Sequence, residues 1–297
     1  MPYKGSDIYK DDLLSGNETY YKDAWRRLKK NKTAIISMII LALLILIAII
    51  GPYLSKFDYR TTDMSVLNIT PNSVHWFGTD DLGRDMYVRV LYGIRISLAV
   101  GIVSAAINFV IGIIYGGISG FYGGMVDNVM MRIVDVLFSI PVVLYVILLM
   151  VVLGGAKIQN IFIALGISYW ASMARIVRAQ VLSLKQQEYI LAARALGAKD
   201  RRLIIKHLIP NCMGPIIITL TMSIPAAIFT EAFLSYIGLG VSAPMASLGV
   251  LCNSAVQTLR SYPYQLIFPS LAICIIMLSF NLLGDGLRDA LDPKMRR

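Results

Sequence analysis

The chain has 297 residues, of which 57% are hydrophobic and only 15% are charged, and its mean hydropathy is +0.66. This balance excludes a soluble globular surface and is typical of a protein embedded in a membrane. A net charge of +10 suits a nucleic-acid ligand in principle. The basic residues flank apolar runs, however, and no recognisable nucleic-acid module accompanies them, so we interpret the charge as a signal of membrane topology.

Six apolar runs predict an all-α membrane protein with six transmembrane helices, each near the roughly 20 residues that cross a bilayer. The expected spans are 33–55, 94–120, 129–153, 158–179, 212–239 and 264–287. The first run follows a polar segment and lacks a small-residue cleavage site, so we expect a retained span rather than a signal peptide. The predicted units are an N-terminal segment 1–32, a first helix 33–55, an extracytoplasmic segment 56–93 and a core domain 94–290.

The distribution of Lys and Arg predicts the orientation. With the N-terminus inside, about three-quarters of the 28 basic residues fall on the cytoplasmic side of the six spans. We therefore expect a multi-pass membrane protein with both termini in the cytoplasm. The three cysteines, Cys212, Cys252 and Cys274, are far apart and form no CxxC pair, which predicts free thiols and no metal site.

A polar loop, 180–211, separates the fourth and fifth runs. A largely hydrophobic membrane protein keeps such a polar loop where a partner outside the bilayer binds it. Gly197 tolerates the left-handed conformation that ends a short helix, and Pro210 suits the first turn of the next one. Alanines between these points predict a small-residue helix face that another protein approaches closely: Ala192, Ala193, Ala195 and Ala198.

Before the second run, Asp85 is a predicted N-terminal cap for a helix that carries Met86, Val90 and Leu91 on one side. Asp80, Asp81 and Asp85 lack the alternating register of a calcium loop, so turn and cap chemistry explains them better. The second run also repeats glycine every four residues, which predicts a face for close helix packing: Gly112, Gly116, Gly120 and Gly124.

Glu231 is the acidic residue most surely within a span. An ionisable group at that depth faces protein or water rather than lipid. It is a candidate for translocation, either as a proton relay or as a substrate contact, and equally a candidate for a structural hydrogen-bond partner.

Two segments resemble a known family. The 180–211 loop is similar to the cytoplasmic "EAA" loop of bacterial ABC-importer permeases, although Leu191 replaces its glutamate and His207 its first isoleucine. The residues that hold its spacing are Ala192, Ala193, Gly197, Ile209 and Pro210. The second segment resembles C-type subunits of oligopeptide and dipeptide permeases through Phe77, Gly78, Thr79, Asp80, Gly83, Arg84, Asp85, Arg89, Gly93, Arg95, Ser97 and Leu98.

The resemblance implies a type I ABC-importer permease that imports peptides by alternating access. It implies four kinds of partner: a second permease, two cytoplasmic ATPases that hold ATP and Mg²⁺, an extracytoplasmic peptide-binding protein, and membrane lipid. No cofactor is expected on this chain. The residues implied in coupling to the ATPases are Glu188, Ala192, Ala193, Gly197, Asp200 and Pro210, with Glu231 as the translocation candidate.

The chain contains no GxxxxGK[ST], HExxH or GxSxG pattern, so we expect no catalytic residue and no ATPase on this chain. An ion-coupled secondary transporter with Glu231 as its proton site is the alternative, and a membrane-embedded enzyme is a third hypothesis. The substrate stays open among dipeptides, longer peptides, nickel chelates and glutathione.

Overall fold

The structure is a computed structural model that describes residues 20–155, 157–241 and 244–292. Residues 1–19 of the predicted N-terminal segment lie outside the described part. Every regular element in this part is helical. Five helices are long and apolar enough to cross a membrane, and a bent pair makes a sixth span, as the six-helix fold predicts.

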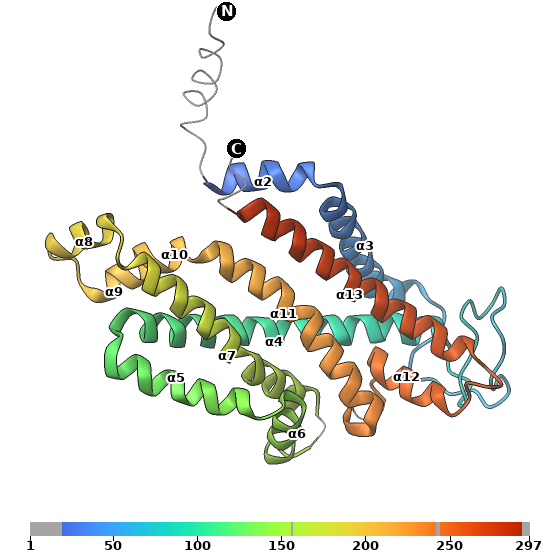
Figure 1. The fold of residues 1–297 in the computed structure, drawn as a ribbon. Coiled ribbons are helices and arrows are strands. Elements are labelled where there is room, and N and C mark those ends of the chain that lie inside the picture. The colour runs from blue at the N-terminus through green and yellow to red at the C-terminus, as the bar shows by residue number, and fades with distance from the viewer. Residues whose placement is uncertain (1–19, 156, 242–243, 293–297) are drawn as a thin grey trace, which may run out of the picture.

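The helices form an elongated bundle in which α4 runs almost from end to end (Figure 1). The long ones are α3 (Lys32–Leu54), α4 (Met86–Tyr122), α7 (Ile158–Leu184), α11 (Met213–Leu234) and α13 (Tyr264–Leu291). The bent pair is α5 (Gly124–Ser139) and α6 (Val142–Val152), and the shorter elements are α2 (Tyr20–Lys30), α8 (Glu188–Ala195), α9 (Asp200–Arg202), η1 (Leu203–Leu208), α10 (Ile209–Asn211), η2 (Ser235–Leu239) and α12 (Leu248–Val256).

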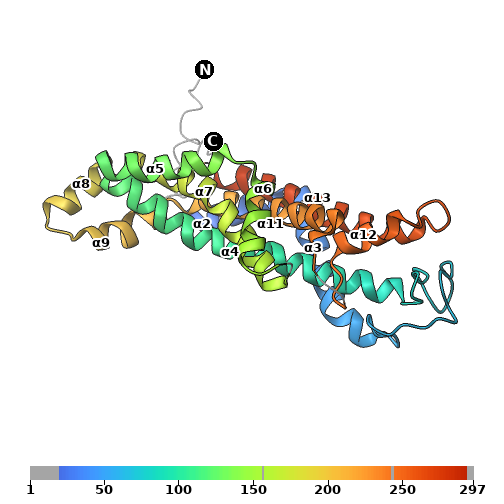
Figure 2. The same ribbon diagram turned by 90° about the horizontal axis from the view of Figure 1, so that it is seen from below.

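The glycine face of α4 packs directly on α7. A Cβ added at Gly116 would lie 2.3 Å from the Ala174 carbonyl oxygen, and one at Gly120 would lie 2.8 Å from the Arg178 carbonyl oxygen. The predicted close approach of a neighbouring helix is therefore confirmed for α4, and Figure 2 shows the two helices together along the bundle. Gly124 does not belong to this face, because it begins α5 and has no heavy atom within 4 Å of its would-be Cβ.

The third predicted span, 129–153, is not one straight helix. It consists of α5 and α6, which meet at an angle of 96°. Pro141 causes the break, because a proline disfavours helical geometry in the residue before it, and Ile140 is accordingly extended (φ −97°, ψ 127°).

The second span also begins eight residues earlier than 94, because Asp85 caps α4 by accepting a hydrogen bond from the Val88 N–H at 3.0 Å.

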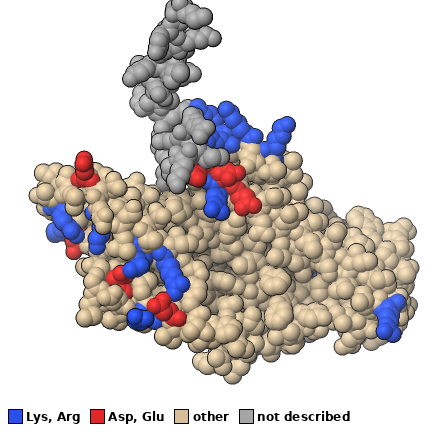
Figure 3. Space-filling model, viewed as in Figure 1, with Lys and Arg blue, Asp and Glu red and all other residues tan. Residues whose placement is uncertain are grey.

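Charged side chains gather at the ends of the bundle. On the face in Figure 3, basic and acidic side chains lie toward the end that carries α8 to α10 and near α2, and a basic side chain lies at the opposite end, while the middle of the bundle is almost free of charge. A wide uncharged belt between charged ends is the surface that a bilayer requires.

Candidate functional site

The loop between α7 and α11, residues 185–212, folds into short helical turns at one end of the bundle (Figure 1). Helix α8 ends just before Gly197, whose φ of +81° is the left-handed conformation expected at a glycine stop. Pro210 is the second residue of α10, which continues directly from η1, so it lies within a helical stretch rather than at a free helix start. Glu188 and Asp200 are exposed in the first turns of α8 and α9, near the positive ends of those helix dipoles.

The four alanines of the 185–212 loop do not share one face. Ala193 and Ala198 are half-buried against an apolar cluster beneath the loop, whereas Ala192 and Ala195 are exposed. The exposed face also carries large apolar side chains that the alanine pattern did not reveal: Tyr189 (46% exposed), Leu191 (52%) and Leu196 (89%). Exposed apolar surfaces of this kind are typical of sites that contact another protein or a membrane.

The loop is anchored to the end of α4. Ile190, on α8, is buried in the same cluster as Phe121 of α4. The Arg194 guanidinium lies 5.5 Å from the centre of the Phe121 ring. Lys185 donates to the carbonyls of Gly120 and Phe121 at 3.2 and 3.0 Å, which satisfies free acceptors at the C-terminus of α4. These contacts fix the position of α8 relative to the end of α4.

Helix α7 is held to α5 at the same end of the bundle. Asp127 of α5 accepts hydrogen bonds from the Arg178 guanidinium and from the Ser119 hydroxyl. Nearby, Arg175 donates to Asp135 at 2.7 Å. These contacts join α4, α5 and α7 around the entry to the 185–212 loop. The Arg178–Asp127 and Arg175–Asp135 partners lie 51 and 40 residues apart in the chain, so local sequence patterns could not predict them.

At the opposite end of α4, residues 55–85 form a compact segment built on one carboxylate. Asp80 accepts hydrogen bonds from the backbone N–H groups of Leu82 and Arg84, both at 2.9 Å. The same carboxylate pairs with the guanidinium groups of Arg84, at 2.8 Å, and of the buried Arg89. Turn chemistry, as expected, accounts for this aspartate.

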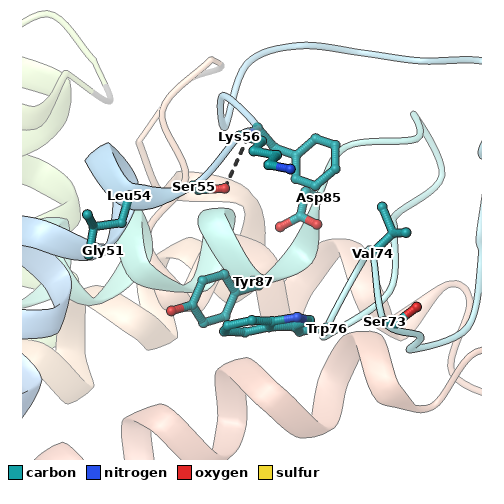
Figure 4. Close-up of a pocket in the computed structure, with 10 residues that line it drawn as sticks. Gly51, Leu54, Ser55, Lys56, Ser73, Val74, Trp76, Asp85 and Tyr87 are labelled. Carbon is teal, nitrogen blue, oxygen red and sulfur yellow. Dashed lines mark hydrogen bonds between the residues drawn. The ribbon is translucent and has the colours of Figure 1, made fainter.

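The 55–85 segment also docks on α4 and α13. Asp85 caps α4 with one oxygen and lies 2.9 Å from His75 Nδ1 with the other. The Thr79 carbonyl accepts hydrogen bonds from Tyr264 and Gln265 of α13, each at 3.0 Å. Beside this junction, a cavity of about 440 Å³ is lined by Trp76, Tyr87 and Asp85 together with the last turn of α3 (Figure 4).

Glu231 is fully buried in α11. Its carboxylate accepts hydrogen bonds from the hydroxyl of Ser235, at 2.7 Å, and from that of Ser97 in α4, at 3.2 Å. Ser247, which caps α12, provides a third hydroxyl. The side chain therefore joins α11 to η2, to α4 and to the cap of α12. This geometry favours a structural hydrogen-bond partner over a proton relay or a substrate contact.

Comparison with known proteins supports the family resemblance given above. Residues 109–297 match the family described as the binding-protein-dependent transport system inner membrane component, and residues 19–71 match the N-terminal transmembrane domain of oligopeptide transport permease C. The oligopeptide permease protein OppC of Bacillus subtilis is 53% identical over 93% of this chain and 90% of its own length. The dipeptide permease protein DppC of the same organism is 51% identical over 97% and 90%.

Solved structures agree on the fold. The inward-facing MetNI methionine ABC transporter matches with a TM-score of 0.57 at 21% identity, over 70% of this chain and 98% of the matched one. A crystal structure of an amino acid ABC transporter matches with a TM-score of 0.51 at 18% identity, over 67% and 92%. The chain therefore belongs to the inner-membrane components of binding-protein-dependent transport systems, within the branch of oligopeptide and dipeptide ABC-importer permeases.

Proposed function

We propose that this permease imports peptides and that its 185–212 loop is the docking site for a cytoplasmic ATPase subunit. The observation that carries the docking role is the exposed apolar face of α8, above all Leu196 at 89% exposure. A groove on a partner would bury this face, while the anchors at Ile190 and Lys185 carry the movement into the bundle.

In this proposal the 185–212 loop and both chain termini lie in the cytoplasm, and the 55–85 segment lies outside. A second permease completes the pathway, two ATPases bind ATP and Mg²⁺, and an extracytoplasmic binding protein delivers the peptide. ATP binding closes the ATPases and moves α8, and the bundle opens outward by alternating access. The opposite positions of the two segments on α4 support this arrangement.

Leu196→Asp is expected to abolish recovery of the ATPases with the permease and to reduce peptide uptake at least about a hundredfold. A carboxylate at the centre of an apolar contact would lose its hydration without gaining a partner. The side chain touches little within this chain, so the permease should still reach the membrane at its normal level. Co-purification from native membranes and uptake of labelled di- and oligopeptides measure the two effects.

Gln186→Asp is the matched control, because Gln186 is exposed on the same loop just before α8. Normal ATPase recovery with Leu196→Asp would refute the docking role. Ala193→Asp and Gly197→Asp should also abolish uptake. Leu196→Asp distinguishes a loss of docking from a loss of folding better, however. Substitutions at the half-buried Ala193 or at Gly197, which needs its positive φ, can also disturb the fold of the loop.

Glu231→Gln is expected to retain most of the uptake, because the amide oxygen accepts one of the two serine hydroxyls and the amide N–H can donate to the oxygen of the other. Glu231→Leu should instead cost about 1–3 kcal/mol of stability, since it leaves several buried hydroxyls without an acceptor. Thermal unfolding in detergent and uptake test the pair. The ion-coupled alternative requires the opposite, namely loss of uptake with Glu231→Gln and transport that persists without the ATPases.

A further inference from the structure

The first span contains a proline in its last turn. Pro52 lies in α3 and has no N–H to donate to the Ala48 carbonyl, four residues earlier. A backbone acceptor without a donor is costly in a membrane, because hydrocarbon supplies no water to replace it. Ala48 itself is 1% exposed and packs in the core between α3, α4 and α13, so the carbonyl needs a donor from the protein.

Arg95 of α4 supplies that donor. Its Nε and Nη2 donate to the Ala48 carbonyl at 3.2 and 3.0 Å, and Nη2 also donates to the Ile49 carbonyl at 3.0 Å. The planar guanidinium presents its donors in a fixed fork, which suits two neighbouring acceptors. One side chain therefore joins α3 to α4 at the point where Pro52 interrupts the hydrogen bonds of α3.

Aromatic rings hold the guanidinium in place. Arg95 lies 4.7 Å from the centre of the Tyr92 ring and 5.7 Å from that of Tyr53. Tyr92 stacks on Tyr59 at 3.7 Å, and Arg60 lies 4.9 Å from the centre of the Tyr59 ring. The result is a stack of two rings between two guanidinium groups, which leads from the end of α3 into the 55–85 segment.

We propose that Arg95 is a positioning residue that replaces the N–H missing from Pro52 and thereby fixes the start of the 55–85 segment on α4. Ser55 follows Pro52 by only three residues, so a loose end of α3 would displace the whole segment. The consequence for transport rests on the proposed function, in which this segment lies outside the membrane beside the docked binding protein.

The test is a double substitution in the whole transporter, purified in lipid nanodiscs. In Arg95→Ala, backbone amides of residues 48–57 should exchange with deuterium about tenfold faster or more, because the Ala48 carbonyl has lost its donors. Pro52→Ala restores a backbone N–H, so the Arg95→Ala/Pro52→Ala variant should recover protection. Peptide uptake should fall in the single variant and recover in the double one, while Arg95→Lys should retain an intermediate level.

Arg60→Ala is the control, because it shortens the stack without removing any donor to the α3 carbonyls. It should leave exchange at residues 48–57 within about twofold of the parent protein. The proposal is overturned if the double variant exchanges as fast as Arg95→Ala, or if Arg60→Ala exchanges as fast. Deuterium exchange can be measured without peptide transport or ATP hydrolysis. The exchange rates of residues 48–57 therefore test the role of Arg95 even if the proposed function is wrong.

Discussion

Replacing Gly116 with alanine is expected to separate α4 from α7 and to lower the amount of folded permease in the membrane. The new Cβ would lie 2.3 Å from the Ala174 carbonyl oxygen and 2.9 Å from the Val177 Cβ, both below any normal contact distance. A backbone carbonyl cannot rotate aside as a side chain can, so α4 and α7 have to move apart. These two helices share the most extensive helix–helix contact of the bundle. Such overpacking costs about 3 kcal/mol at the upper end of its usual range.

Gly117→Ala is the matched control on the next residue of α4. Its Cβ would meet only Ile209 Cδ1, at an ordinary 3.5 Å, and alanine favours a helix more than glycine does. Membrane abundance and thermal unfolding in detergent should therefore fall for Gly116→Ala and hold for Gly117→Ala. Equal losses in both variants would show that glycine itself, rather than the close approach to α7, is what the bundle requires.

Features fixed by local chemistry were predictable from the sequence. The stop at Gly197 and the cap at Asp85 each depend on a few neighbouring residues, and the structure confirms both. The break at Pro141 had an equally local signal. A hydropathy average over 129–153 conceals it, since Pro141 sits inside an otherwise continuous apolar run.

Features that depend on distant partners were not predictable. Which side of α8 is buried is decided by the cluster around Phe121, so the alanines could not be assigned to a face from their spacing alone. The bond between Ser97 and Glu231 spans 134 residues, and that between Arg95 and Ala48 spans 47. The sequence singled out Glu231 by its position within a span and Arg95 as part of a family motif, but it contained no information about the groups they meet.

Removing the Asp80 carboxylate is expected to disorder the 55–85 segment and to abolish uptake. Arg89 is only 3% exposed and pairs with Asp80, while Arg84 bonds to the same oxygen. In Asp80→Ala, a buried guanidinium loses its counter-charge, and two turn N–H groups lose their acceptor. Breaking one side of a buried ion pair costs about 3–5 kcal/mol, far more than the loss of an exposed one.

Asp81→Ala provides the comparison, because it removes the same charge one residue away. The Asp81 side chain is 59% exposed and lies 3.9 Å from Arg84, so its loss should cost no more than about 1 kcal/mol. Limited proteolysis of the 55–85 segment in membrane vesicles should give rapid cleavage for Asp80→Ala and parent-like resistance for Asp81→Ala. Resistance in both would mean that the docking of Thr79 on Tyr264 and Gln265 holds the segment without its central carboxylate. Cleavage in both would mean that net negative charge, rather than the buried pair, keeps the segment folded.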